Sequence, residues 1–115
     1  MEILIQTING KIFKCPACNA FHIEFKNLNF NLKEEDFWNF VHDISKIDGK
    51  YCEGLNAHSN YSRKIIIPIS RDKFNVLLNN EELVEFKRLL SFRQNYTPYQ
   101  KIIKAGEFEF TSNLN

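Results

Sequence analysis

The sequence has 115 residues, of which 43% are hydrophobic and 25% charged, as in one ordinary globular domain. These values exclude a disordered tail, a collagen-like repeat and a small disulfide scaffold. Fifteen basic and fourteen acidic side chains leave a net charge of +1, so the charge indicates no nucleic-acid partner and no anionic membrane surface.

Two further exclusions concern the location of the chain. No apolar run approaches the roughly 18 residues that a membrane-spanning helix needs, and Met1–Gln6 has no basic region of the kind that opens a secretory signal. Three cysteines are too few, and odd in number, for a disulfide framework. We therefore expect a cytoplasmic protein.

The first 26 residues predict three strands. Residues 2–8 and 11–15 are β-prone, and Asn9-Gly10 between them is the dipeptide that a type I′ turn favours. Residues 20–26 then alternate between apolar and polar side chains, which is typical of a half-buried strand.

A fourth strand is expected over residues 28–32, where apolar side chains alternate with asparagines. The apolar positions change from odd to even numbers between Phe25 and Leu28. A continuous strand would thus change faces, so we expect a bulge or a tight turn near Lys26-Asn27.

An amphipathic helix is predicted from about Glu34, with three acidic residues in its first turn, where they suit the helix dipole. Its apolar stripe has the spacing i, i+3, i+4, i+7 and consists of Phe37, Phe40, Val41 and Ile44. Trp38 and His42 lie on the opposite flank. We expect Trp38 to be a partly buried rim residue or, alternatively, a contact for a partner.

The pattern is lost over residues 46–62, which predicts a long loop. A buried strand is expected over 63–69, where Pro68 favours a sheet edge or a strand end. A strand over 74–78 and a helix over 80–92 follow. The form of a capping box, with Asn79 as the cap and Glu82 three residues later, marks the start of that helix.

Residues 74–90 repeat the pattern of residues 28–44 at a shift of 46 positions, which suggests a tandem strand-helix pseudo-repeat. The order ββββα-ββα, with a C-terminal edge strand around Phe108 and Phe110, indicates an α+β fold with a largely antiparallel sheet and two amphipathic helices. We expect one domain over 1–93 and a C-terminal extension over 94–115. The apolar positions predict one contiguous core, made of Phe21, Ile23, Phe25, Phe37, Phe40, Ile44, Ile65, Ile67, Leu83, Phe86 and Leu90.

Several motifs resemble a bacterial family of small proteins of unknown function. They are Cys15-x-x-Cys18, Ile23-Glu24-Phe25-Lys26-Asn27-Leu28, Phe37-x-x-Phe40, Arg63-Lys64-Ile65-Ile66-Ile67-Pro68, Leu78-Asn79-x-x-Glu82-Leu83 and Leu89-Leu90. The resemblance covers about residues 11–90 and implies one intact cytoplasmic domain. It implies no activity, substrate or ligand.

Cys15-Pro16-Ala17-Cys18 is the motif with the clearest chemical content. A Cys-x-x-Cys turn between strands is half of a zinc ribbon, but the usual second pair is missing. Donors for the other positions are Cys52 and His58 in the long loop, together with His42 and with His22, which lies close to the turn on the wet face of its strand.

Three hypotheses for function follow. The leading one is a non-enzymatic binding or regulatory module that acts through protein contacts or as a homodimer, because no catalytic constellation is visible. The second is a structural zinc domain that uses Cys15 and Cys18, completed by Cys52 or His58 or by a second copy of the chain. The third is a thiol oxidoreductase using the same pair, although such pairs usually open a helix. We expect no bound cofactor, since the second pair of ligands has no recognisable spacing.

Overall fold

The computed structural model describes residues 1–70 and 73–92, and these form two compact units. Unit 1 comprises Met1–Lys46 and the described residues from Lys87 onward, and unit 2 comprises Ile47–Phe86. No helix of the described chain is both long and apolar enough to cross a bilayer. The edge strand expected around Phe108 lies outside the described residues.

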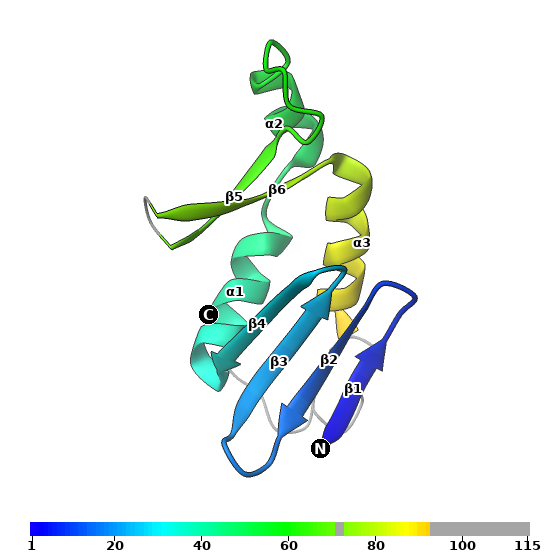
Figure 1. The fold of residues 1–115 in the computed structure, drawn as a ribbon, viewed down its shortest axis with the longest axis vertical. Coiled ribbons are helices and arrows are strands. Elements are labelled where there is room, and N and C mark those ends of the chain that lie inside the picture. Colours follow the sequence, from blue (N-terminus) through cyan, green and yellow to red (C-terminus); the bar gives the residue numbers. More distant parts are fainter. Residues whose placement is uncertain (71–72, 93–115) are drawn as a thin grey trace. The chain divides into compact units, whose positions relative to one another are not determined.

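Unit 1 is built on a four-stranded antiparallel sheet with the order β1-β2-β3-β4 (Figure 1). The strands are β1 (Glu2–Gln6), β2 (Gly10–Cys15), β3 (Ala20–Phe25) and β4 (Leu28–Lys33), and they are followed by helix α1 (Glu34–Ser45). The phase shift after Phe25 is a tight turn, as predicted, with Lys26 at a positive φ of 54°. The antiparallel α+β class is confirmed.

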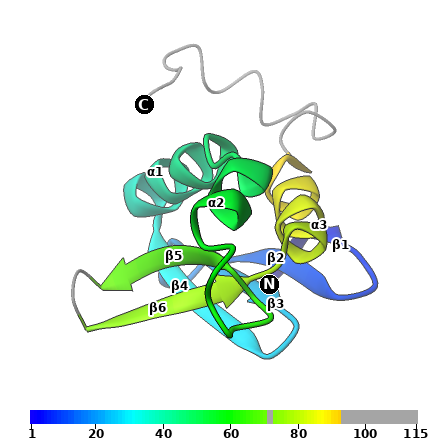
Figure 2. The same ribbon diagram turned by 90° about the horizontal axis from the view of Figure 1, so that it is seen from above.

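One face of this sheet carries the core of unit 1. Helix α1 and the last residues of α3 (Asn80–Leu90) lie over that face (Figure 2). Phe21 on β3 stacks on Phe37 of α1, with ring centroids 4.3 Å apart. The buried apolar side chains of unit 1 are Ile12, Phe21, Ile23, Phe25, Phe37, Trp38, Ile44, Leu89, Leu90 and Phe92.

The apolar stripe of α1 differs from the predicted one. Trp38 is only 8% exposed, because its ring stacks on Phe92 at 5.9 Å and meets the edge of Phe37 at 4.8 Å. The interpretation of Trp38 as a rim residue or a partner contact is therefore wrong. Phe40 is half-buried beside Phe30, at 5.3 Å, rather than in the core.

The first hairpin forms, but its turn is not type I′. Neither Asn9 nor Gly10 has the positive φ that this turn requires. The reversal is instead centred one residue earlier, on Ile8-Asn9, because Gln6 pairs with Lys11 and the Gly10 carbonyl accepts a hydrogen bond from Thr7 N–H. A Cβ at Gly10 would lie 2.6 Å from the Glu24 carbonyl oxygen. Glycine is thus required here for close approach.

Unit 2 contains helix α2 (Gly49–Leu55), the antiparallel pair β5 (Ile65–Ser70) and β6 (Phe74–Leu78), and the first part of α3. The prediction of an unbroken loop over 46–62 is wrong. Asp48 caps α2 by accepting a hydrogen bond from Tyr51 N–H, and Gly49 is buried where a Cβ would lie 2.9 Å from Leu83.

The predicted start of α3 is confirmed in detail. The Glu82 N–H donates to Asn79 Oδ1 at 2.8 Å, and the Asn79 N–H donates to Glu82 Oε1 at 3.0 Å, which is a reciprocal capping box. Arg63 adds a bidentate ion pair to the same carboxylate, at 2.7 and 2.8 Å. The buried side chains of unit 2 are Ile65, Ile67, Leu78, Glu82, Leu83 and Phe86.

Candidate metal centre

The turn between β2 and β3 brings the two sulfurs of the Cys-x-x-Cys motif together. Cys15 ends β2 and pairs with Ala20, so residues 16–19 form the turn. The Asn19 N–H donates to the Cys15 carbonyl at 2.9 Å, and Asn19 takes a positive φ of 52° that its short polar side chain tolerates. This tight reversal returns Cys18 to the end of β2.

His22 joins the cysteines through the pairing of the strands. Because Cys15 lies opposite Ala20 and alternate residues share a face, His22 is on the same face as Cys15. That face is opposite to the one that carries Phe21 and the core. The His22 ring stacks on Phe13, its cross-strand partner, with centroids 4.8 Å apart and planes within 15°.

The three side chains form one cluster. The donor atoms of Cys15, Cys18 and His22 all lie within 4.8 Å of one another. Cys15 and His22 are half-buried and Cys18 is exposed. The three cysteines of the chain form no disulfide, so both sulfurs of the cluster are available as ligands.

Asn31 on β4 orients the imidazole. The Nδ1 atom of His22 donates a hydrogen bond to the side-chain oxygen of Asn31, its cross-strand partner. An amide oxygen only accepts, so Nδ1 carries the proton and Nε2 keeps its lone pair. A second hydrogen bond of this kind is what orients most metal-ligating histidines.

The two thiols are electrostatically unequal. Hydrogen bonds from the Cys18 thiol and the Cys18 backbone N–H lower the pKa of Cys15 from 9.0 to about 7. The same contact with Cys15, together with desolvation, raises the pKa of Cys18. At pH 7 Cys15 is therefore about half ionised, next to a Cys18 whose own pKa is raised.

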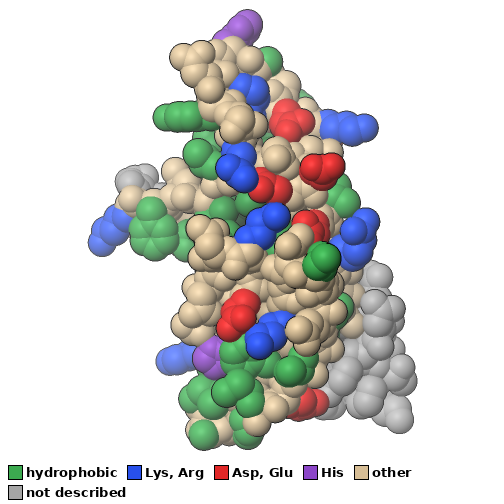
Figure 3. Space-filling model, turned by 45° about the vertical axis from the view of Figure 1, so that its right-hand side comes forward, with side chains coloured by type: hydrophobic (Ala, Val, Ile, Leu, Met, Phe, Trp, Pro, Cys, Tyr) green, Lys and Arg blue, Asp and Glu red, His purple; other side chains and the backbone are tan. Residues whose placement is uncertain are grey.

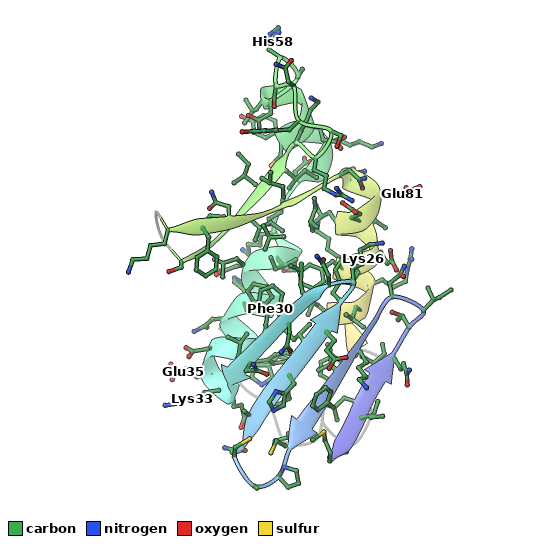
Figure 4. The ribbon with its side chains drawn as sticks, in the orientation of Figure 1. Lys26, Phe30, Lys33, Glu35, His58 and Glu81 are labelled. Atoms are coloured by element: carbon green, nitrogen blue, oxygen red, sulfur yellow. The ribbon has the colours of Figure 1, made fainter. Side chains whose placement is uncertain are left out.

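The other predicted donors belong to unit 2 or to α1. Cys52 is half-buried on α2, and His58 is exposed in the turn that follows α2 (Figure 4). His42 is exposed in the last turn of α1. The cluster itself is built from unit 1 alone, with His22 as its third donor. The sequence held a signal for His22, because a four-residue turn after Cys15 places residues 15, 20 and 22 on one face.

The surface around the cluster is largely apolar. Figure 3 shows hydrophobic and cysteine side chains, drawn in one colour, gathered at the lower end of unit 1. Met1, Ile3, Pro16, Ala17 and Cys18 are exposed in the start of β1 and in the β2–β3 turn. The cluster is thus open to molecules in solution.

Comparison with known proteins places the chain in a family without assigning it an activity. No curated protein and no solved structure matches it. A family model described as "Family of unknown function (DUF6686)" matches residues 1–115, including the tail beyond Ser91 that the recognised motifs did not reach. The chain therefore belongs to DUF6686, a family of unknown function.

Proposed function

We propose that this protein is a small zinc-binding module in which Cys15, Cys18 and His22 hold one ion. The observation that carries the proposal is the convergence of three ligand atoms within 4.8 Å. Zinc prefers thiolate sulfur and imidazole nitrogen. Two thiolates would neutralise its double charge, which suits an apolar surface.

The surroundings of His22 support this proposal over the metal-free expectation. The Asn31 oxygen holds the imidazole in the tautomer whose Nε2 can bind a metal. The lowered pKa of Cys15 also supports it, because the metal ligand is the thiolate. His22, which the sequence already offered as a donor close to the turn, supplies the third ligand atom.

The metal content of protein purified without chelator tests the proposal. We expect about one zinc per chain in the unaltered protein, and loss of that zinc in C15S, C18S and H22A. The matched controls C52S and H58A should keep it, since the cluster belongs to unit 1. A metal-free unaltered protein, or equal zinc in C15S, would contradict the proposal.

Thiol oxidoreduction by the same pair is the second candidate. The unequal pKa values of Cys15 and Cys18 favour it, because a thiolate next to a thiol is the reactive form of a dithiol. A purified protein that is free of zinc, and that reduces a disulfide substrate in a Cys15-dependent reaction, would establish this activity in place of zinc binding.

The remaining hypotheses concern the partners, the location, the domain organisation and the origin of the protein. A binding role through protein contacts or a homodimer is supported by strand β1, which lies at an edge of the sheet and exposes 55% of Ile3. A cytoplasmic location is consistent with a site that needs reduced thiols. Two expectations stay predictions. They are the organisation into one domain over 1–93 with an extension over 94–115, and the bacterial origin.

A further inference from the structure

The number of protein ligands in the cluster is lower than zinc usually has. Structural zinc sites are closed by four protein ligands, whereas sites with three keep a position for an outside group. Within residues 1–70 and 73–92 the cluster has three donors, Cys15, Cys18 and His22. Cys18 and the rest of its turn, residues 16–19, are exposed. An incoming molecule can therefore approach the ion from the side of Cys18.

The core of unit 1 is built without the cluster. Phe21, Ile23 and Phe25 on β3 point to the face that α1 covers, and all three are buried. His22 and Cys15 point to the other face of the sheet. A metal that stabilises a small fold normally takes the place of a core. Here the aromatic core and the donors are on opposite faces of the sheet. The fold of unit 1 therefore has a core that does not depend on the ion.

From the open position and the separate core we infer that the site is an exchange site, which passes its zinc to an acceptor that carries two thiols. This inference rests on the proposed zinc binding and adds a function to it. Thiols are the acceptor class because replacing one zinc–thiolate bond by another changes the bonding little. The acceptor thiols can belong to a small dithiol or to a cysteine pair of another protein.

The transfer is a ligand substitution that balances without a redox partner. A zinc ion with three protein ligands holds a water in its fourth position. The first acceptor sulfur would form a bond to zinc and displace this water, and the thiol proton of the acceptor would be released. The bond from zinc to Cys18, the most exposed donor, then breaks, and the Cys18 sulfur takes up a proton. The second acceptor thiol replaces Cys15 in the same way, and Nε2 of His22 leaves unchanged. Zinc stays divalent throughout.

The test uses the full chain loaded with Co²⁺, whose visible absorption reports thiolate ligation. Dithiothreitol serves as the small dithiol, and a peptide with two Cys-x-x-Cys pairs serves as the protein-like acceptor. We expect the transfer rate to double when the acceptor concentration doubles, because the acceptor enters before the donors leave. If only dithiothreitol shows this dependence, the acceptor is a small dithiol. If only the peptide shows it, the acceptor is a cysteine pair of another protein. C52S should transfer at the same rate as the unaltered protein.

Three results would overturn the inference, and they have different meanings. A transfer rate that is independent of the concentration of both acceptors shows spontaneous release and removes the exchange function only. Loss of the far-ultraviolet circular dichroism of the metal-free protein shows a structural ion and again removes only the exchange function. No uptake of Co²⁺ or Zn²⁺ at all removes the proposed zinc binding, and the exchange function with it.

Discussion

The side-chain oxygen of Asn31 accepts a hydrogen bond from Nδ1 of His22 across the β3–β4 pair. Asn31 is exposed and lies on β4, which contributes no metal ligand. Its role toward the proposed ion is therefore to orient His22, which is the ligand.

Replacing Asn31 by alanine should weaken zinc binding about 10–100-fold, the usual effect of losing the partner of a metal-ligating histidine. The physical reason is that the imidazole loses its fixed tautomer and orientation. Competition with a chelator of known affinity measures the change. N29A is the matched control, because Asn29 is exposed on the same face of β4. Equal affinities of the two variants would contradict the positioning role of Asn31.

The second prediction concerns pH. In the metal-free protein on a C52S background, alkylation of Cys15 should rise with pH and reach half its maximal rate at a pH of about 7, since the thiolate is the nucleophile. C18A removes the hydrogen bonds from the Cys18 thiol, so the pKa of Cys15 should move upward toward its ordinary value. A midpoint that C18A leaves unchanged would show that the Cys18 thiol does not lower the pKa of Cys15.

The third prediction uses two glycines with opposite surroundings. Gly10→Ala should destabilise the protein by about 1–3 kcal/mol, because the new Cβ meets the Glu24 carbonyl oxygen at 2.6 Å and a Leu89 methyl at 2.8 Å. Gly54→Ala meets nothing within 4 Å and lies in a helix, so it should stabilise by up to about 1 kcal/mol. Urea denaturation measures both changes, and a loss at Gly54 as large as at Gly10 would refute the steric explanation.

The fourth prediction concerns the two phenylalanines of α1. Phe37→Ala should cost about 3–5 kcal/mol, since its ring is fully buried and stacked on Phe21. Phe40→Ala should cost clearly less, because Phe40 is half-buried beside Phe30. The free energy of unfolding of the two variants decides this, and equal losses would mean that Phe40 belongs to the core after all.

Local patterns predicted much of the fold. The alternation over residues 20–32 and the helical spacing from Glu34 identified β3, β4 and α1. Asn79 and Glu82 identified the start of α3, because both partners of a capping box lie within one turn of the helix. The strand-helix pattern at a shift of 46 recurs as β4-α1 and β6-α3.

Features that depend on partners distant in sequence were missed. Helix α2 has seven residues and two glycines, so its own propensity is weak, and its buried Gly49 fits against Leu83. Trp38 is buried because Phe92 covers it. In both cases the decisive contact joins residues that no local pattern connects. His22 is different: the sequence offered it as a donor near the turn, and the register of β2 with β3 places it on the face of Cys15.

The central claim is that Cys15, Cys18 and His22 bind one zinc ion, and X-ray absorption at the zinc edge tests it most directly. In protein loaded with one equivalent of zinc, we predict two sulfur neighbours at about 2.3 Å and a nitrogen neighbour at about 2.0–2.1 Å. C52S should give the same first shell, because Cys52 lies outside the cluster. A first shell of oxygen and nitrogen without sulfur would contradict the claim.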